Sequence, residues 1–89
     1  MDARALVARN IRRLRVARLL SQEALAVDAG IDRTYVSRLE RGLENPTVAV
    51  LDQIARALRA DIAEFFARPK PGERPPATLP SGRKKRGPG

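Results

Sequence analysis

The sequence predicts an all-α domain of five short helices followed by a disordered tail. Over residues 1–66, apolar residues recur at spacings of three and four, the period of an amphipathic helix, and no segment alternates as a strand would. Beyond residue 66 the chain holds six of its seven prolines and one large aliphatic residue, too little apolar surface to offset the entropy of ordering. We therefore expect a helical domain over residues 1–66 and a disordered Pro/Gly-rich basic tail over residues 67–89.

The first two helices follow from apolar spacing and one cap. Val7, Ile11 and Leu14 lie four and three residues apart, which predicts a helix over residues 3–18. Ser21 suits an N-cap, because its hydroxyl can accept a hydrogen bond from a free N–H of the next turn. The apolar face of the helix that it starts comprises Leu25, Ala26 and Ala29.

Three more helices begin at polar caps. Asp32 and Thr47 precede the third and fourth helices, and "DIAE" at residues 61–64 resembles a capping box that opens a short fifth helix. Gly30 and Gly42 are placed to end the second and third helices, since glycine readily adopts the left-handed conformation found after many helices.

The composition argues against an enzyme. The chain has no cysteine and no histidine, and nothing in it resembles a nucleophile–base pair or a phosphate-binding glycine loop. We therefore expect no catalytic site, no metal and no cofactor. No apolar run approaches the roughly 18 residues of a membrane span, so we expect no membrane partner. The lack of cysteine fits the reducing cytoplasm, where we expect the protein to be associated with the nucleoid.

The net charge of +8 is unevenly distributed. Residues 1–66 contribute +2 of it and residues 67–89 contribute +6. The basic balance therefore reflects mainly the tail and does not by itself indicate a nucleic-acid-binding domain. The "RKKR" of the tail is compatible with non-specific affinity for phosphates and equally with a solvated segment that has no essential role.

The segment "GIDRTYVSRLERG", residues 30–42, is the best candidate for a binding surface. On a helical wheel, Val36 and Leu39 point inward and Tyr35 lies on the border. The opposite face has three arginines, two hydroxyls and no acid, whereas solvated helix faces usually mix charges of both signs. This difference favours a binding face over an ordinary surface. The outer face comprises Arg33, Thr34, Ser37, Arg38 and Arg41.

Glu40 falls near the core edge of the same helix. A half-buried carboxylate needs a partner, and Arg15 occupies the matching border of the first helix. We predict that Arg15 and Glu40 form an ion pair that joins the first helix to the third and has a structural role.

Several motifs together resemble a known family. They are "LSQEALA", the short turn around Gly30, "YVSRLERG", and "NPT" leading to "LDQIARAL". Over about residues 6–66 the chain resembles the lambda-repressor-like (Cro-repressor, XRE-type) helix-turn-helix domain. The resemblance implies a compact five-helix bundle whose third helix lies in the major groove of double-stranded DNA.

The resemblance also implies roles for individual residues. Its base-reading positions fall on Arg33, Thr34, Ser37 and Arg38. Its phosphate-contacting positions fall on Gln22 and, as further candidates, on Tyr35, Arg41, Asn10 and Asn45. Many members have glycine where this chain has Leu19 and Arg59, so either those helix ends close differently or the chain gives up some stability.

The leading hypothesis is a sequence-specific transcriptional regulator, expected to be a repressor, that binds a palindromic operator as a homodimer. A protein-interaction module, such as an antitoxin that neutralises a toxin partner, is the main alternative, and non-specific packaging of nucleic acid through the tail is a third. A phage repressor, an antitoxin and a restriction–modification controller all remain open as subtypes. Phe65, Phe66 and the apolar edge of the fourth helix are candidates for the dimer surface, although burial of both phenylalanines in the core is the simpler expectation.

Overall fold

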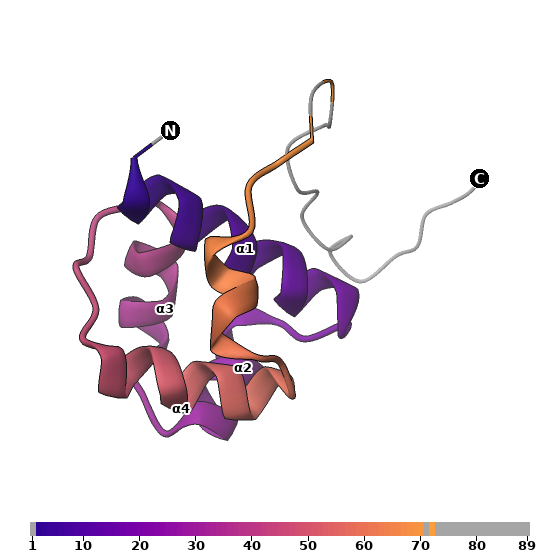
Figure 1. Cartoon of the computed structure of the whole chain (residues 1–89). Coiled ribbons are helices and arrows are strands. Elements are labelled where there is room, and N and C mark those ends of the chain that lie inside the picture. The colour runs from indigo at the N-terminus through magenta and orange to yellow at the C-terminus, as the bar shows by residue number, and fades with distance from the viewer. Residues whose placement is uncertain (1, 71, 73–89) are drawn as a thin grey trace.

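The computed structural model describes residues 2–70 and 72, and within them the only regular elements are helices (Figure 1). Helix α1 packs against α3 and the short η1, and α2 packs against α3 and α4. In Figure 1, η1 lies between α1 and α4. The elements are α1 (Ala3–Ala17), α2 (Gln22–Ala29), α3 (Arg33–Glu40), α4 (Val48–Leu58) and the 3₁₀ helix η1 (Ile62–Phe66).

The all-α prediction is confirmed, but the prediction of five α-helices is wrong in its last member. Ile62–Phe66 is a five-residue 3₁₀ helix. The predicted capping box is present: the Asp61 side chain accepts from the N–H of Ala63 at 2.9 Å, and Glu64 accepts from the N–H of Asp61 at 3.0 Å. A segment this short leaves room for few α-helical hydrogen bonds, and short pieces of this kind commonly take the tighter 3₁₀ geometry.

The predicted helix starts are confirmed by their cap hydrogen bonds. Ser21 accepts from the N–H of Ala24 at 3.0 Å, and Thr47 accepts from that of Val50 at 3.1 Å. Asp32 caps α3 in the same way. Each cap satisfies an N–H that the helix itself leaves without a partner, which is why these short local patterns locate the helices well.

Between residues 2 and 70, four residues adopt the left-handed backbone conformation, each just after a helix. Gly30 and Gly42 have φ angles of 72° and 74°, as expected of glycines that follow helices. Leu19 and Arg59 adopt the same conformation, with φ angles of 60° and 53°, although neither is glycine. The helix ends therefore close in the usual way, at a cost of roughly 1–2 kcal/mol for each non-glycine residue.

The two neighbouring phenylalanines differ in burial. Phe65 is fully buried, so it is excluded from the dimer surface considered above, whereas Phe66 is about half exposed at 47%. The buried core residues come from all four α-helices and from η1: Val7, Ile11, Leu25, Ala26, Ala29, Val36, Leu39, Leu51, Ile54, Ala55, Leu58 and Phe65.

Most of the predicted tail lies outside the described residues, as does its "RKKR". Residues 67–70 are described and contain no helix or strand. Among the helices of the described part, none has the length and apolar character that crossing a bilayer demands.

Candidate nucleic-acid interface

Helices α2 and α3 are joined by a tight turn at Gly30. The N–H of Gly30 lies 3.2 Å from the carbonyl of Val27, and that of Ile31 lies 3.0 Å from the carbonyl of Ala26. These bonds satisfy carbonyls at the end of α2, and Asp32 then caps α3. A Cβ added at Gly30 would meet nothing within 4 Å, so the left-handed backbone alone favours glycine there. The turn fixes the orientation of α3 relative to α2.

Helix α3 has a buried face and an outer face. Val36 and Leu39 are buried in the core. This anchoring leaves the other side of the helix free to contact a partner. Four residues were predicted to read bases. Arg33, Thr34 and Arg38 are exposed, and Ser37 is half-buried.

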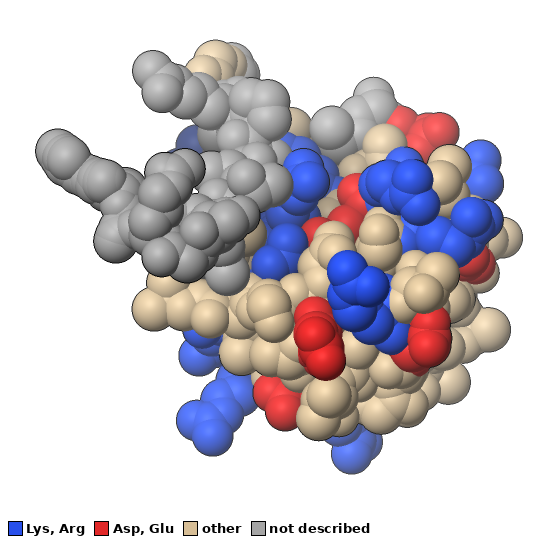
Figure 2. Space-filling view, turned by 180° about the vertical axis from the view of Figure 1, so that it is seen from behind, with Lys and Arg blue, Asp and Glu red and all other residues tan. Residues whose placement is uncertain are grey.

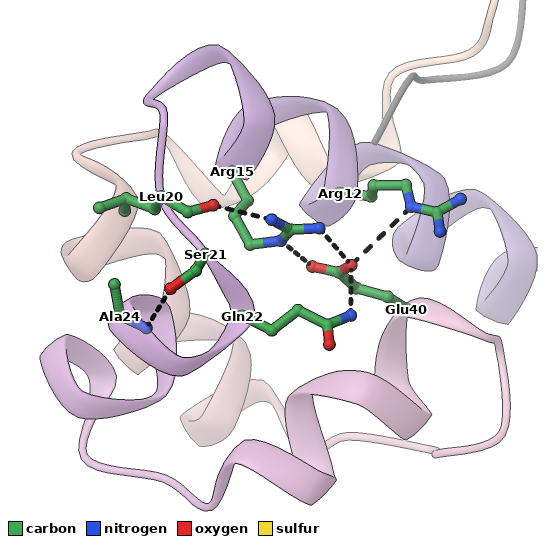
Figure 3. A network of polar contacts seen from close by, with 7 residues as sticks. All are labelled: Arg12, Arg15, Leu20, Ser21, Gln22, Ala24 and Glu40. Atoms are coloured by element: carbon green, nitrogen blue, oxygen red, sulfur yellow. Dashed lines mark hydrogen bonds and ion pairs between the residues drawn. The ribbon is translucent and has the colours of Figure 1, made fainter. Parts of the chain in front are cut away.

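The ion pair expected between Arg15 and Glu40 is present and buried (Figure 3). Arg15 donates from Nε to Oε2 of Glu40 at 2.6 Å and from Nη2 to Oε1 at 2.9 Å. Its Nη1 donates to the carbonyl of Leu20 at 2.7 Å, and its side chain is only 6% exposed. A two-bond pair of this kind connects α1 to α3 and fixes both side chains in one geometry.

Two further side chains approach the carboxylate of Glu40 (Figure 3). Gln22, the first residue of α2, donates from Nε2 to Oε1 of Glu40 at 3.1 Å. Nε of Arg12 lies 3.9 Å from the same oxygen, too far for a hydrogen bond, and finds no hydrogen-bond partner in the described part of the chain. One carboxylate thus faces two guanidinium groups, and this leaves positive charge beside the start of α2. The sequence prediction did not include Arg12.

Arg38, on the outer face of α3, has an acidic neighbour that the helical wheel does not include. Its Nε donates to Oε2 of Glu44 at 2.7 Å, and its Nη2 lies 3.5 Å from the carbonyl of Leu43. The side chains of Arg38 and Glu44 are 44% and 27% exposed. Glu44 lies beyond the end of α3, so the only sequence signal for its approach is Gly42, which turns the chain back toward the helix.

Tyr35 lies on the border of α3, as its wheel position predicts. It packs against the core while remaining partly exposed. Burial, and secondarily the negative charge of Glu44, raise the pKa of Tyr35 above its ordinary value. The phenol is therefore neutral at physiological pH and can donate a hydrogen bond to an anionic acceptor.

Asn10 cannot contact a phosphate, so that prediction is wrong. Its side chain is fully buried and donates to the carbonyls of Phe65 and Ala67, at 2.9 Å and 2.8 Å. Its Oδ1 accepts from Nε of Arg13 at 3.2 Å. The amide is thus used to fasten the segment around η1 to α1. By contrast, the remaining phosphate candidates keep at least partial exposure: Gln22, Tyr35, Arg41 and Asn45.

Charge on the domain is mixed in sign. Figure 2 shows basic and acidic side chains interspersed on one face of the molecule. This distribution agrees with the small net charge of residues 1–66. Recognition by this domain would therefore depend on individual side chains rather than on a broad positive surface.

Two short helices joined by a tight turn, the second with one face buried in the core and the other exposed, form the arrangement of a helix-turn-helix. A family model described as Helix-turn-helix (HTH_3) matches residues 11–65. The chain belongs to this helix-turn-helix family.

Two comparisons illustrate the relationship to other proteins. The chain is 47% identical over 65 residues to "Uncharacterized HTH-type transcriptional regulator y4dJ" of Sinorhizobium fredii (strain NBRC 101917 / NGR234), covering 73% of this chain and 84% of that protein. Its structure is similar to that of a hypothetical transcription factor from Neisseria, with a TM-score of 0.74, 40% identity, and 76% and 78% of the two chains covered.

A third relative has been solved with DNA. The restriction–modification controller protein C.Esp1396I, as a tetramer in complex with its natural 35 base-pair operator, matches this chain with a TM-score of 0.69 and 32% identity. The match covers 74% of this chain and 87% of the controller.

Proposed function

We propose that this protein is a sequence-specific DNA-binding transcriptional regulator that places α3 in the major groove. The observation that carries this proposal is the division of α3, with Val36 and Leu39 buried and Arg33, Thr34 and Arg38 exposed. The major groove of B-DNA is wide enough to admit a helix and displays a distinct set of donors and acceptors for each base pair.

The outer face of α3 supplies the base contacts in this proposal. Arg33 and Arg38 are suited to guanine, because the planar guanidinium can donate two parallel hydrogen bonds to O6 and N7. Thr34 and Ser37 have hydroxyls that both donate and accept, and so can contact several bases.

Phosphate contacts come from the edges of the same surface. Gln22 and Arg12 lie beside the Glu40 carboxylate at the N-terminus of α2. Free backbone N–H groups at that helix end also favour an anion. Tyr35, neutral and partly exposed, can donate from its hydroxyl. Arg41 and Asn45, exposed beyond the end of α3, complete the phosphate contacts that we propose.

We propose further that the protein acts in the cytoplasm as a homodimer that represses transcription from a two-fold symmetric operator. A single domain reads few base pairs, and pairing places two recognition helices about one helical turn, roughly 34 Å, apart. The controller C.Esp1396I forms a tetramer on its operator, which supports assembly of related domains on DNA. Phe66, half exposed at the end of η1, is our candidate for the subunit contact.

Selection of bound duplexes from a random-sequence pool tests the proposal directly. We expect enrichment of a palindromic motif. Gln22→Ala should weaken binding to all duplexes by a similar factor, because a phosphate contact has no sequence preference. An unenriched pool would overturn the proposal and would favour the protein-interaction module.

A further inference from the structure

We propose that Glu44 is a specificity-determining residue, which orients the Arg38 guanidinium toward a base and weakens the binding of Arg38 to phosphates. The inference rests on the proposed DNA-binding function and deepens it. It concerns a residue outside α3 that nevertheless contacts the outer face of that helix.

The backbone brings Glu44 to this position. Gly42 is left-handed, its N–H lies 3.0 Å from the carbonyl of Leu39, and the N–H of Leu43 lies 3.0 Å from the carbonyl of Arg38. These bonds fold the chain back over the last turn of α3. A carboxylate six residues after Arg38, too distant for a neighbour along a continuous helix, is therefore in contact with its guanidinium.

The geometry divides the guanidinium into two edges. The edge formed by Nε and Nη2 faces the loop, where Nε donates to Glu44 and Nη2 approaches the carbonyl of Leu43. Within the described residues, the hydrogen bonds of the Arg38 guanidinium use only these two nitrogens. The end edge, made of Nη1 and the second N–H of Nη2, keeps two donors side by side. Two parallel donors match O6 and N7 of a guanine.

The negative charge of Glu44 also favours contact of Arg38 with guanine over contact with phosphates. Affinity for DNA of any sequence comes mainly from positive charges that approach phosphates. A carboxylate 2.7 Å from Nε of Arg38 offsets that charge, so a phosphate gains little from Arg38. A correctly placed guanine still gains two directed hydrogen bonds. Glu44 thus lowers non-specific binding more than specific binding.

Removal of Glu44 should leave the fold intact, because the pair is partly exposed and such pairs contribute little to stability. The test therefore compares the full-length wild-type protein with Glu44→Gln. Asp52→Asn is the matched control, since Asp52 also pairs with an arginine, Nε of Arg56 at 3.1 Å, but in an exposed pair on α4. Both variants lose one negative charge.

Affinities are measured at one fixed salt concentration for the selected operator, for operators with single base-pair changes and for a scrambled duplex. For Glu44→Gln we expect roughly threefold to tenfold tighter binding to the scrambled duplex and about tenfold weaker discrimination at one base position. Asp52→Asn should change both by less than about twofold. In an Arg38→Ala background, Glu44→Gln should no longer affect discrimination.

Three results separate the outcomes. If Glu44→Gln changes all affinities by one common factor, or changes none, Glu44 does not determine specificity and the inference is overturned while the proposed function stands. If the loss of discrimination persists without Arg38, the inference is equally overturned. A wild-type protein that binds all duplexes alike overturns the proposed function and the inference together.

Discussion

Two hydrogen-bonded arginine–glutamate pairs of the described residues involve α3, and they differ in nearly every physical respect. Arg15 and Glu40 come from different helices and are 6% and 1% exposed, with two hydrogen bonds between them. Arg38 and Glu44 are six residues apart and are 44% and 27% exposed, with one short hydrogen bond. The buried pair holds the helix in place, and the exposed pair influences what that helix can contact. The same two residue types thus serve structure in one place and, in our proposal, recognition in the other.

The largest effect is expected from breaking the buried pair. Glu40→Ala leaves the guanidinium of Arg15 buried without its partner, and Gln22 also loses its acceptor. We expect a loss of about 3–5 kcal/mol in the free energy of unfolding, measured by urea denaturation. Replacement of both partners, Arg15→Met with Glu40→Leu, should cost less than Glu40→Ala alone. A loss below about 1 kcal/mol for Glu40→Ala would show that the pair behaves like a surface pair.

A smaller effect, and on binding rather than folding, is expected on the outer face. Arg38→Ala and Arg33→Ala should each weaken operator binding by roughly 1–3 kcal/mol and relax the preference at one base position. Their free energies of unfolding should change by less than about 1 kcal/mol, because both side chains are exposed. Equal losses on every duplex would show that these arginines contact phosphates instead of bases.

The smallest effect is expected from Glu44→Gln on stability. The exposed pair should contribute less than about 1 kcal/mol to the free energy of unfolding, and that contribution should decrease as salt is added. Urea denaturation of Glu44→Gln and of Asp52→Asn at low and high salt measures both. A loss comparable with that of Glu40→Ala would mean that the two pairs do not differ as the structure indicates.

Sequence patterns predicted the local features of the fold well. The caps at Ser21, Asp32 and Thr47 and the glycine turns at Gly30 and Gly42 are all confirmed. The helical wheel predicted the Arg15–Glu40 pair, because both residues lie at the border of an apolar face, where a charge needs a partner.

Features that depend on how separate segments pack were predicted poorly. Nothing local distinguishes Phe65 from Phe66, yet one is fully buried and the other half exposed. The amide of Asn10 could donate to a phosphate, but in the folded chain η1 packs against α1 and the amide donates to the carbonyls of Phe65 and Ala67 instead. Glu44 was missed because a helical wheel ends where the helix ends.

By itself, the sequence determined the helical class, the starts and ends of the helices, and which residues of α3 face outward. Those features depend on a residue and its neighbours within one or two turns, so caps, glycines and apolar spacing suffice. Only the tertiary structure decided which polar side chains are buried and which acid accompanies Arg38. These outcomes depend on contacts between residues that the folded backbone brings together, and the desolvation and pairing of each group follow from that arrangement.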